Sequence, residues 1–436
     1  MADAYTASRA LRRAQLRTIL LLFGGYAACY YCRVDLSVAT PLLVEELGRH
    51  GIRHGEALIH IGTMSSLGIA AYALGKLFLT GLGDYWGGRR NFLIGVGGAA
   101  AFTLLFGLSG SLPVFTLAWI GNRLTQSVGW AGLIKVSSKW FDYSSYGLIL
   151  GILSVSYLVG DALARQQMGM LIEHGYGWRA LFVFAAVVAG VMLLANVLWL
   201  GESRAQEGHP EARPNPLNLF AATESRPASV GALLLPLMHS RAFLLVCLLS
   251  FTCTIIRETF NTWTPMYLRD HLGYSISHAA ALSAIFPGVG AVSVLVAGWL
   301  SDRLGLNGRA LLLFVGLLAT AGALLALVAV RSAPDSLLPL VTIGVVAFCL
   351  LGPYSYLGGA FALDFGGKQA SAASSGIIDG VGYLGGVLAG DSVARLAVAF
   401  GWDGVFVTLA GVSAVAAVGA GTLLLLNSKA VRPVHA

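Results

Sequence analysis

The chain has 436 residues, of which 56% are hydrophobic and only 11% are charged, and its mean hydropathy is +0.75. Soluble domains carry about 25% charged residues, so this composition excludes an ordinary soluble protein. The formal net charge of +7 acquires a meaning only from the positions of the basic residues, and we expect no nucleic-acid partner.

Twelve apolar stretches approach the ~20 residues that a helix needs to cross the hydrocarbon core of a bilayer. In chain order they cover residues 18–44, 57–81, 91–110, 113–138, 146–172, 178–200, 242–268, 276–300, 310–330, 336–362, 370–398 and 402–426. The sequence therefore predicts an all-α membrane protein with twelve transmembrane helices.

The longest polar interruption divides these stretches into two sets of six. It covers residues 201–241 and combines Pro, Gly and charges of both signs, as in GESRAQEGHPEARPNP. We therefore predict six-helix halves over 1–200 and 242–436, joined by a cytoplasmic linker. Most basic residues outside the spans lie on the side that holds both termini, so the positive-inside rule makes both termini cytoplasmic.

The two halves resemble each other. Gly177-Trp178 recurs as Gly401-Trp402, an offset of 224 residues. GLGDYWGGRR after the second stretch and GWLSDRLGLNGR after the eighth both resemble the signature loop of the major facilitator superfamily. This resemblance implies two pseudo-symmetric halves around a midplane site. The expected conformational residues, which bind helix ends in one state and release them in another, are Asp84, Arg89, Asp302 and Arg303.

Charged residues also occur inside the predicted spans, where each costs from about 2.5 to over 10 kcal/mol unless it finds a partner, water or a substrate. They are Arg33, Asp35, Lys76, Arg123, Lys135, Asp161, Arg165, Arg257, Glu258, Asp379, Asp391 and Arg395. Cationic residues outnumber acidic ones in this set, so we expect a pocket with net positive charge.

Arg33 and Arg257 are the leading candidates for binding. They lie in the first helix of each half, and their separation of 224 residues equals the offset of the repeat. A guanidinium offers a planar fork that suits the oxygens of phosphate. The alternative is that they only pair with Asp35 or Glu258. Adjacent residues point about 100° apart on a helix, and we therefore expect such pairing to be disfavoured.

Several segments together resemble the organophosphate/phosphate antiporters, which include glycerol-3-phosphate and hexose-phosphate transporters. They are GGYAACYYCRVDLSVATPLLVEELG (24–48), GKLFLTGLGD (75–84), GNRLTQSVGWAG (121–132), RETFNTWTPMYL (257–268), LGPYSYLGGAFALD (351–364) and YLGGVLAGDSVARLAVAFGWDGVF (383–406). The resemblance implies that Arg33 and Arg257 bind phosphate, that Lys76 lies near them, and that an organic phosphate is exchanged for inorganic phosphate.

The chain departs from that family in the fifth helix. Where the glycerol-phosphate antiporters offer a histidine to the phosphate, an ungapped reading gives Tyr157. A tyrosine donates one hydrogen bond but takes up no proton near neutral pH. Tyr30 and Trp263 are further candidates for contact with a sugar or glycerol part, with packing or interface anchoring as the alternative.

Other charges leave the mechanism open. Asp161 with Arg165, and Asp391 with Arg395, have the i, i+4 spacing of intrahelical pairs. They indicate either charge neutralisation or a role in coupling or in binding a polyhydroxyl substrate. Arg123 begins R-x-x-Q-S-x-G, which resembles the fourth helix of proton-coupled facilitators. Together with Asp35, these acids support proton symport of another organic anion as an alternative to antiport.

The sequence contains no visible nucleophile–base pair, metal cluster or phosphate loop of the G-x-x-x-x-G-K-[ST] type. We therefore expect no enzyme, metal or cofactor, but a monomeric carrier of a small organophosphate in exchange for inorganic phosphate. A transporter-like sensor of sugar phosphate is a further alternative, since some relatives of this family are sensors. The richness in Ala, Gly and Arg indicates a bacterial inner membrane, with the lipid bilayer as its surroundings.

Overall fold

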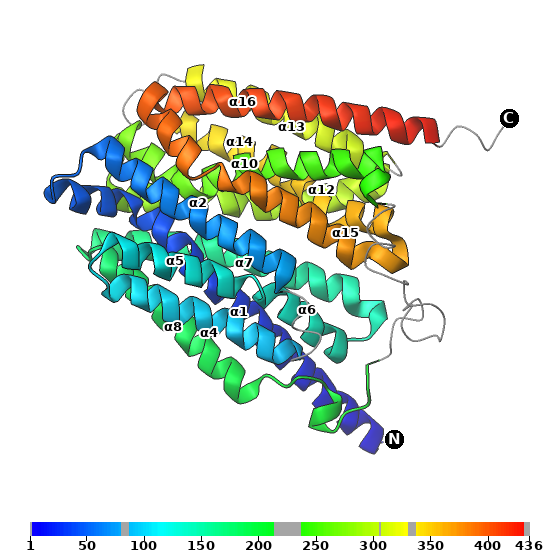
Figure 1. Ribbon diagram of the computed structural model, residues 1–436. Coiled ribbons are helices and arrows are strands. Elements are labelled where there is room, and N and C mark those ends of the chain that lie inside the picture. Colours follow the sequence, from blue (N-terminus) through cyan, green and yellow to red (C-terminus); the bar gives the residue numbers. More distant parts are fainter. Residues whose placement is uncertain (1, 80–86, 213–236, 305–306, 330–336, 431–436) are drawn as a thin grey trace. The chain divides into compact units, whose positions relative to one another are not determined.

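The computed structural model describes residues 2–79, 87–212, 237–304, 307–329 and 337–430, and all regular elements in this part of the chain are helices (Figure 1). The helices up to residue 212 are α1 (Ala2–Arg49), α2 (His54–Phe78), α4 (Gly88–Leu108), α5 (Leu112–Gln126), α6 (Gly129–Trp140), α7 (Tyr143–Glu173), α8 (Trp178–Trp199) and the 3₁₀ turn η1 (Ala205–Glu207). The later ones are α10 (Arg241–Asp270), α11 (Ile276–Leu282), α12 (Ile285–Leu304), α13 (Gly308–Ala329), α14 (Leu338–Tyr354), the π turn η2 (Leu357–Phe361), α15 (Ala362–Val387) and α16 (Asp391–Ala430).

Each of the twelve expected spans coincides with one helix or with two consecutive helices, so the prediction of an all-helical membrane fold is confirmed. Breaks divide the fourth span between α5 and α6, the eighth between α11 and α12, and the eleventh at residues 388–390. Gly401 has φ 69°, a conformation that glycine adopts readily, and separates the eleventh span from the twelfth within α16.

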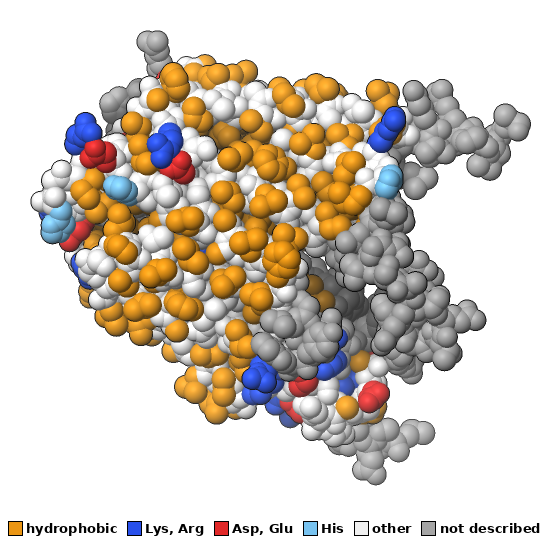
Figure 2. All heavy atoms as spheres, viewed as in Figure 1, with side chains coloured by type: hydrophobic (Ala, Val, Ile, Leu, Met, Phe, Trp, Pro, Cys, Tyr) orange, Lys and Arg blue, Asp and Glu red, His pale blue; other side chains and the backbone are white. Residues whose placement is uncertain are grey.

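Large apolar side chains on the helix surfaces agree with a membrane environment. Among the described residues, nine segments are long and apolar enough to cross a bilayer. On the face shown in Figure 2, hydrophobic side chains cover the middle of the helices and charged side chains gather near helix ends. This distribution matches a hydrocarbon layer between two polar interfaces.

The chain forms two compact units. Unit 1 consists of residues 1–36 and 71–218, and unit 2 of residues 37–70 and 219–436. In unit 1, α4 packs against α5, α6 and α8. A Cβ added to Gly95 would lie 2.8 Å from the Cα of Gly129, so only glycine permits this approach of α4 and α6. In unit 2, α13 packs against α14 and α16, α10 against α15, and α12 against α14.

Residues 37–70, the later part of α1 and most of α2, belong to unit 2. The hydroxyl of Ser37 donates to the carbonyl oxygens of Asn261 (2.8 Å) and Thr262 (2.7 Å) on α10. Gly62 faces the carbonyl oxygen of Gly390, which an added Cβ would approach to 2.9 Å. The compact units therefore differ from the sequence halves 1–200 and 242–436, whose boundaries stay a prediction.

Candidate functional site

Arg33 lies on α1 in unit 1, buried among tyrosines. Its guanidinium carbon is 5.2 Å from the ring centre of Tyr30 and 4.5 Å from that of Tyr72, and the residue is 8% exposed. Tyr30 precedes Arg33 by three residues, so both lie on one face of the helix. The Nζ of Lys76 lies 5.7 Å from the same Tyr72 ring, and Tyr157 packs against Tyr30 with ring centres 5.3 Å apart. The structure thus brings four predicted residues together around one ring that the sequence analysis missed.

Tyr72 had a signal in the sequence, although it was not used. It precedes Lys76 by four residues, which places both side chains on one face of α2. Tyr72 is 2% exposed, so its ring meets the two cations in a desolvated environment. Cation–π attraction is strongest under such conditions, and the ring therefore helps to keep two like charges within one site.

Arg257 lies on α10 in unit 2 and is also 8% exposed. Its guanidinium carbon is 4.8 Å from the ring centre of Tyr354 and 5.3 Å from that of Tyr383. Its Nη2 donates to Oε1 of Glu258 at 2.6 Å. The expectation that neighbouring residues pair poorly is therefore wrong here, because two long side chains can bend toward each other despite their divergent Cβ directions.

The Nε–H of Arg257 is buried and has no hydrogen-bond partner among the described residues. A buried charged donor without a partner is unfavourable, unless a ligand accepts the bond. Phosphate oxygens are strong acceptors for guanidinium donors. The cluster of Arg257, Tyr354 and Tyr383 therefore has the chemistry of an anion site, with Glu258 as an internal counter-charge.

Buried polar side chains of α5 hold α1 at the turn that carries Arg33. Arg123 stacks on Trp119 at 4.5 Å, and its Nη2 lies 3.5 Å from the carbonyl oxygen of Arg33. Gln126 donates to the carbonyl oxygen of Cys32 at 3.2 Å. The Arg123 motif therefore contacts the backbone of α1, and its role in coupling stays a prediction.

Asp35 is fully buried on α1. Its Oδ1 accepts the Leu36 N–H at 2.7 Å, and its Oδ2 has no hydrogen-bond partner among the described residues. Arg123 is a charged neighbour that interacts with this carboxyl electrostatically. A buried carboxyl with an unsatisfied oxygen is a reasonable element of a proton or charge relay.

The two i, i+4 pairs form as expected, but in different surroundings. Asp161 and Arg165 on α7 are 4% and 0% exposed, with Nε and Oδ1 2.5 Å apart. Asp391 and Arg395 make two bonds of 2.7 and 3.2 Å in the first turn of α16, and the Arg395 side chain is 61% exposed. Its place beside the break at 388–390, and its exposure, make this second pair an intrahelical neutralisation rather than a buried charge pair.

Trp263 is buried at the same break. Its Nε1 donates to the carbonyl oxygen of Ala389 at 2.7 Å, and its ring lies 6.2 Å from that of Trp402. Ser66 donates to the carbonyl of Val387 at 2.5 Å and accepts the N–H of Asp391 at 2.9 Å. These bonds satisfy backbone groups that the broken helix exposes. The placement of Trp263 thus agrees with the packing alternative.

The conformational residues are described in part. Asp84 and the side chain of Asp302 lie outside the described residues. The N–H of Arg89 donates to Glu202 at 2.7 Å, and that of Gly88 does so at 3.0 Å. Lys139 pairs with the same carboxylate at 2.5 Å. Glu202 therefore holds the start of α4, a contact that the sequence analysis missed because it assigned residues 201–241 to an exposed linker.

Comparisons with known proteins agree with this architecture. The sequence matches the Major Facilitator Superfamily over residues 18–390. The probable hexose phosphate transport protein of Chlamydia trachomatis is 25% identical over 91% of this chain and 88% of that protein. The membrane sensor protein UhpC of Escherichia coli is 28% identical over 95% and 94%.

A solved structure shares the fold at lower identity. It is that of a bacterial homologue of the human lysosomal transporter Spinster, inward-facing and unoccupied, with a TM-score of 0.71, 16% identity and coverage of 95% and 97% of the two chains. Family, fold and membrane spans together indicate a multi-pass transporter and not an enzyme. The chain therefore belongs to the Major Facilitator Superfamily, and its resemblance to the organophosphate transporters of that superfamily is confirmed.

Proposed function

We propose that this chain carries a small organophosphate across the membrane in exchange for inorganic phosphate, by alternating access. The observation that carries the proposal is the pair of first-helix arginines, Arg33 and Arg257, each 8% exposed and each between two tyrosine rings. Buried guanidiniums bind phosphate through short, charge-assisted hydrogen bonds. The unpartnered Nε–H of Arg257 supplies a donor for such a bond.

The relatives support the same substrate class, since one of them is named a hexose phosphate transport protein. Lys76 adds a third cation beside Arg33, and Tyr157 adds a hydroxyl nearby. Tyrosine hydroxyls suit both the phosphate and the hydroxyl groups of a sugar or glycerol part. We further propose a monomer in the plasma membrane of a bacterium, with both termini cytoplasmic, as the distribution of basic residues favours.

The test is uptake of radiolabelled phosphate into proteoliposomes that are preloaded with phosphate. Lysine at position 33 or 257 keeps the charge but loses the planar fork, so Arg33→Lys and Arg257→Lys should each reduce exchange at least ~10-fold. Arg179→Lys is the matched control, because Arg179 also stacks on an aromatic ring, at 4.2 Å from Trp178, but on the surface. Exchange by wild type that survives both site substitutions would contradict the proposal.

A sensor is the second candidate, and the 28% identity to a membrane sensor protein favours it. A sensor binds sugar phosphate without moving it. Stabilisation of the purified protein by sugar phosphates, combined with the absence of phosphate exchange in proteoliposomes, would support this alternative. Stabilisation with exchange would support the carrier.

Proton symport is a third candidate, supported by the buried carboxyl of Asp35. A proton-coupled carrier accumulates substrate when the outside is made acidic, whereas phosphate exchange needs no pH gradient. Uptake driven by an imposed pH gradient, and abolished by Asp35→Asn, would favour symport over antiport.

A further inference from the structure

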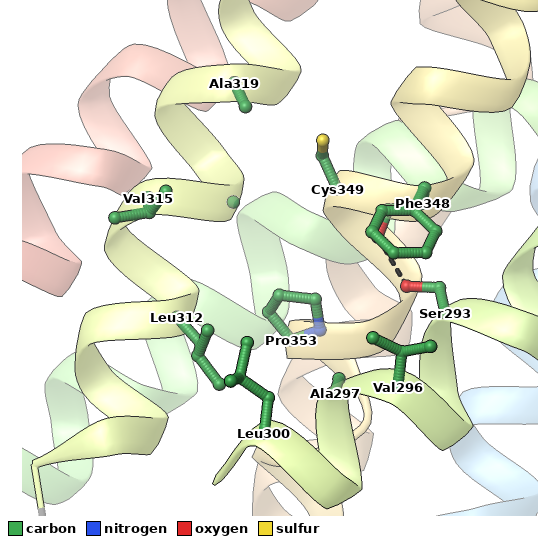
Figure 3. Close-up of a pocket in the computed structure, with 11 residues that line it drawn as sticks. Ser293, Val296, Ala297, Leu300, Leu312, Val315, Ala319, Phe348, Cys349 and Pro353 are labelled. Carbon is green, nitrogen blue, oxygen red and sulfur yellow. Dashed lines mark hydrogen bonds between the residues drawn. The ribbon is translucent and has the colours of Figure 1, made fainter. Parts of the chain in front are cut away.

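A cavity of about 160 Å³ lies within unit 2 between α12, α13 and α14, away from the arginine site (Figure 3). Aliphatic and aromatic side chains line it, among them Val296, Leu300, Val315 and Phe348. The hydroxyl of Ser293 donates to the carbonyl oxygen of Phe348, as the dashed line shows. The serine at this cavity is therefore already satisfied, so the space suits an apolar occupant.

Close packing beside the cavity fixes its walls. A Cβ added to Gly316 would lie 2.5 Å from the carbonyl oxygen of Cys349 and 2.9 Å from the Cγ of Pro353. Pro353 has no N–H, so it cannot donate to the Cys349 carbonyl four residues earlier. The Gly316 backbone occupies the approach to that carbonyl instead. The contact holds α13 against α14, and the cavity therefore belongs to the packed helices rather than to a loose gap between them.

The cavity opens toward lipid. Val296, Val315 and Phe348 line it and are 38%, 52% and 41% exposed. Along α12, Ser293 and Arg303 are ten residues apart, which corresponds to roughly 15 Å of helix. The hydrocarbon core is about 30 Å thick. The cavity therefore lies within one leaflet, at the depth of the acyl chains.

Two arginines lie at one end of the cavity. Arg303 follows the lining residue Leu300 by three residues, and Arg309 precedes the lining residue Leu312 by three. This spacing places each arginine on the helix face that lines the cavity. Arg303 is exposed and stacks on Trp299 at 4.1 Å, and tryptophan at this position is typical of the headgroup level. Even with Asp302 counted, this end has a net positive charge.

We propose that this cavity binds an anionic phospholipid, with an acyl chain in the cavity and the headgroup phosphate at Arg303 and Arg309. Every membrane lipid offers an acyl chain, so the cavity contributes shape but little selectivity. The arginines supply the selectivity, because basic pockets between helices retain anionic headgroups. The orientation predicted from the basic residues places this lipid in the cytoplasmic leaflet.

Native mass spectrometry of the full chain tests the proposal, with phosphatidylglycerol as the anionic probe and phosphatidylcholine as the neutral one. Wild type should retain phosphatidylglycerol roughly 10- to 30-fold better. The double variant Arg303→Gln/Arg309→Gln should lose this preference. Val315→Trp fills the cavity and should reduce the retention of both lipids. Leu318→Trp is its matched control, because Leu318 is 48% exposed on the same helix but does not line the cavity.

Three outcomes would overturn the proposal. They are equal retention of the two lipids by wild type, an unchanged preference in the double arginine variant, and unchanged retention in Val315→Trp. If Val315→Trp fails to fold, the arginine variant still decides, because Arg303 is exposed and its replacement removes no buried packing. An Arg90→Gln variant controls for the general loss of a basic residue, since Arg90 is exposed in unit 1.

Discussion

The two units place similar charged residues in different surroundings. Arg33 and Arg257 are 224 residues apart and equally buried, and each lies between two tyrosine rings. In unit 1 the rings come from α1 and α2, and in unit 2 from α14 and α15. A repeat thus fixes the position of the arginine, whereas its partners come from helices that are not equivalent. The environment of the charge therefore has to be compared residue by residue.

The residues that follow the two arginines differ most. Arg257 is followed by Glu258, which pairs with it, and Arg33 is followed by Val34, which cannot. The carboxylate of unit 1 lies one position further along, at Asp35, and is fully buried. The two arginine sites are therefore similar in their aromatic surroundings and different in their counter-charges, which gives each unit its own dependence on an incoming anion.

The largest expected effect concerns the two i, i+4 pairs. Arg165→Leu leaves Asp161 buried without its partner, and breaking a buried pair in this way costs about 3–5 kcal/mol. Arg395→Leu breaks an exposed pair and should cost at most about 1 kcal/mol. Thermal unfolding in detergent measures both. Equal losses in the two variants would contradict the difference in burial on which this prediction depends.

The double variant Asp161→Asn/Arg165→Leu separates charge from packing. It removes the stranded carboxylate, so most of the stability lost in Arg165→Leu should return. If it does not return, then the contacts of the arginine side chain, and not the ion pair, hold α7 in place.

The second prediction concerns the ring shared by Arg33 and Lys76. Tyr72→Leu removes a buried cation–π partner worth about 2 kcal/mol, so the KM for phosphate exchange should rise about 30-fold. Tyr72→Phe keeps the ring and should change KM little. A loss as large in Tyr72→Phe as in Tyr72→Leu would instead assign the effect to the hydroxyl group.

The third prediction exchanges the acids of the two sites and rests on phosphate binding at both. Glu258→Gln releases Nη2 of Arg257 from its internal partner, so phosphate should bind about tenfold more tightly. Val34→Glu gives Arg33 the same neighbour and should weaken binding by a similar factor, with Val34→Gln as the control for size. Binding is measured by calorimetry on the purified protein. Weaker binding in Glu258→Gln would mean that the glutamate positions the arginine rather than competing for it.

The sequence predicted those features that depend on spacing along one helix. The helical fold, the register of Arg33 and Arg257, and the i, i+4 pairs all follow from local periodicity. Tyr354 and Tyr383 were missed because only tertiary packing brings α14 and α15 to Arg257. The burial that distinguishes Asp161 from Asp391 was missed for the same reason.

Two further misses have a different cause. The break at residues 388–390 follows a run that remains apolar throughout, so hydropathy gave no sign of it. Ser66 and Trp263, distant in sequence, stabilise it. Glu202 was assigned to an exposed linker because its neighbours are polar, yet its carboxylate accepts bonds from the first residues of α4 and from Lys139. A polar segment after a span is not necessarily free of the fold.

The smallest expected effect is that of Glu202 itself, for which the same offset gives the apolar Leu426 in unit 2. Partial burial raises the pKa of this carboxyl, but bonds from Lys139 and from the N–H groups of Arg89 and Gly88 outweigh burial and leave the pKa below its ordinary 4.5. A lowered pKa in the folded state means that the charge stabilises the fold above the ordinary value, and that this contribution disappears as the pH falls through the lowered one. Glu202→Gln should therefore lose about 1 kcal/mol at neutral pH, which corresponds to a fall in Tm of about 2 °C.

The difference between Glu202→Gln and wild type should shrink as the pH is lowered from about 7 to about 3.5, because the wild-type carboxyl becomes protonated and resembles the amide. Thermal unfolding of both proteins across this range measures it. Glu207→Gln is the matched control, since Glu207 pairs with Arg17 at the surface of the same unit and such pairs contribute little. A difference that stays constant with pH would show that Glu202 acts through its shape and its neutral hydrogen bonds. The charge of a carboxylate held by two helix N–H groups and a lysine would then not be what anchors α4 in unit 1.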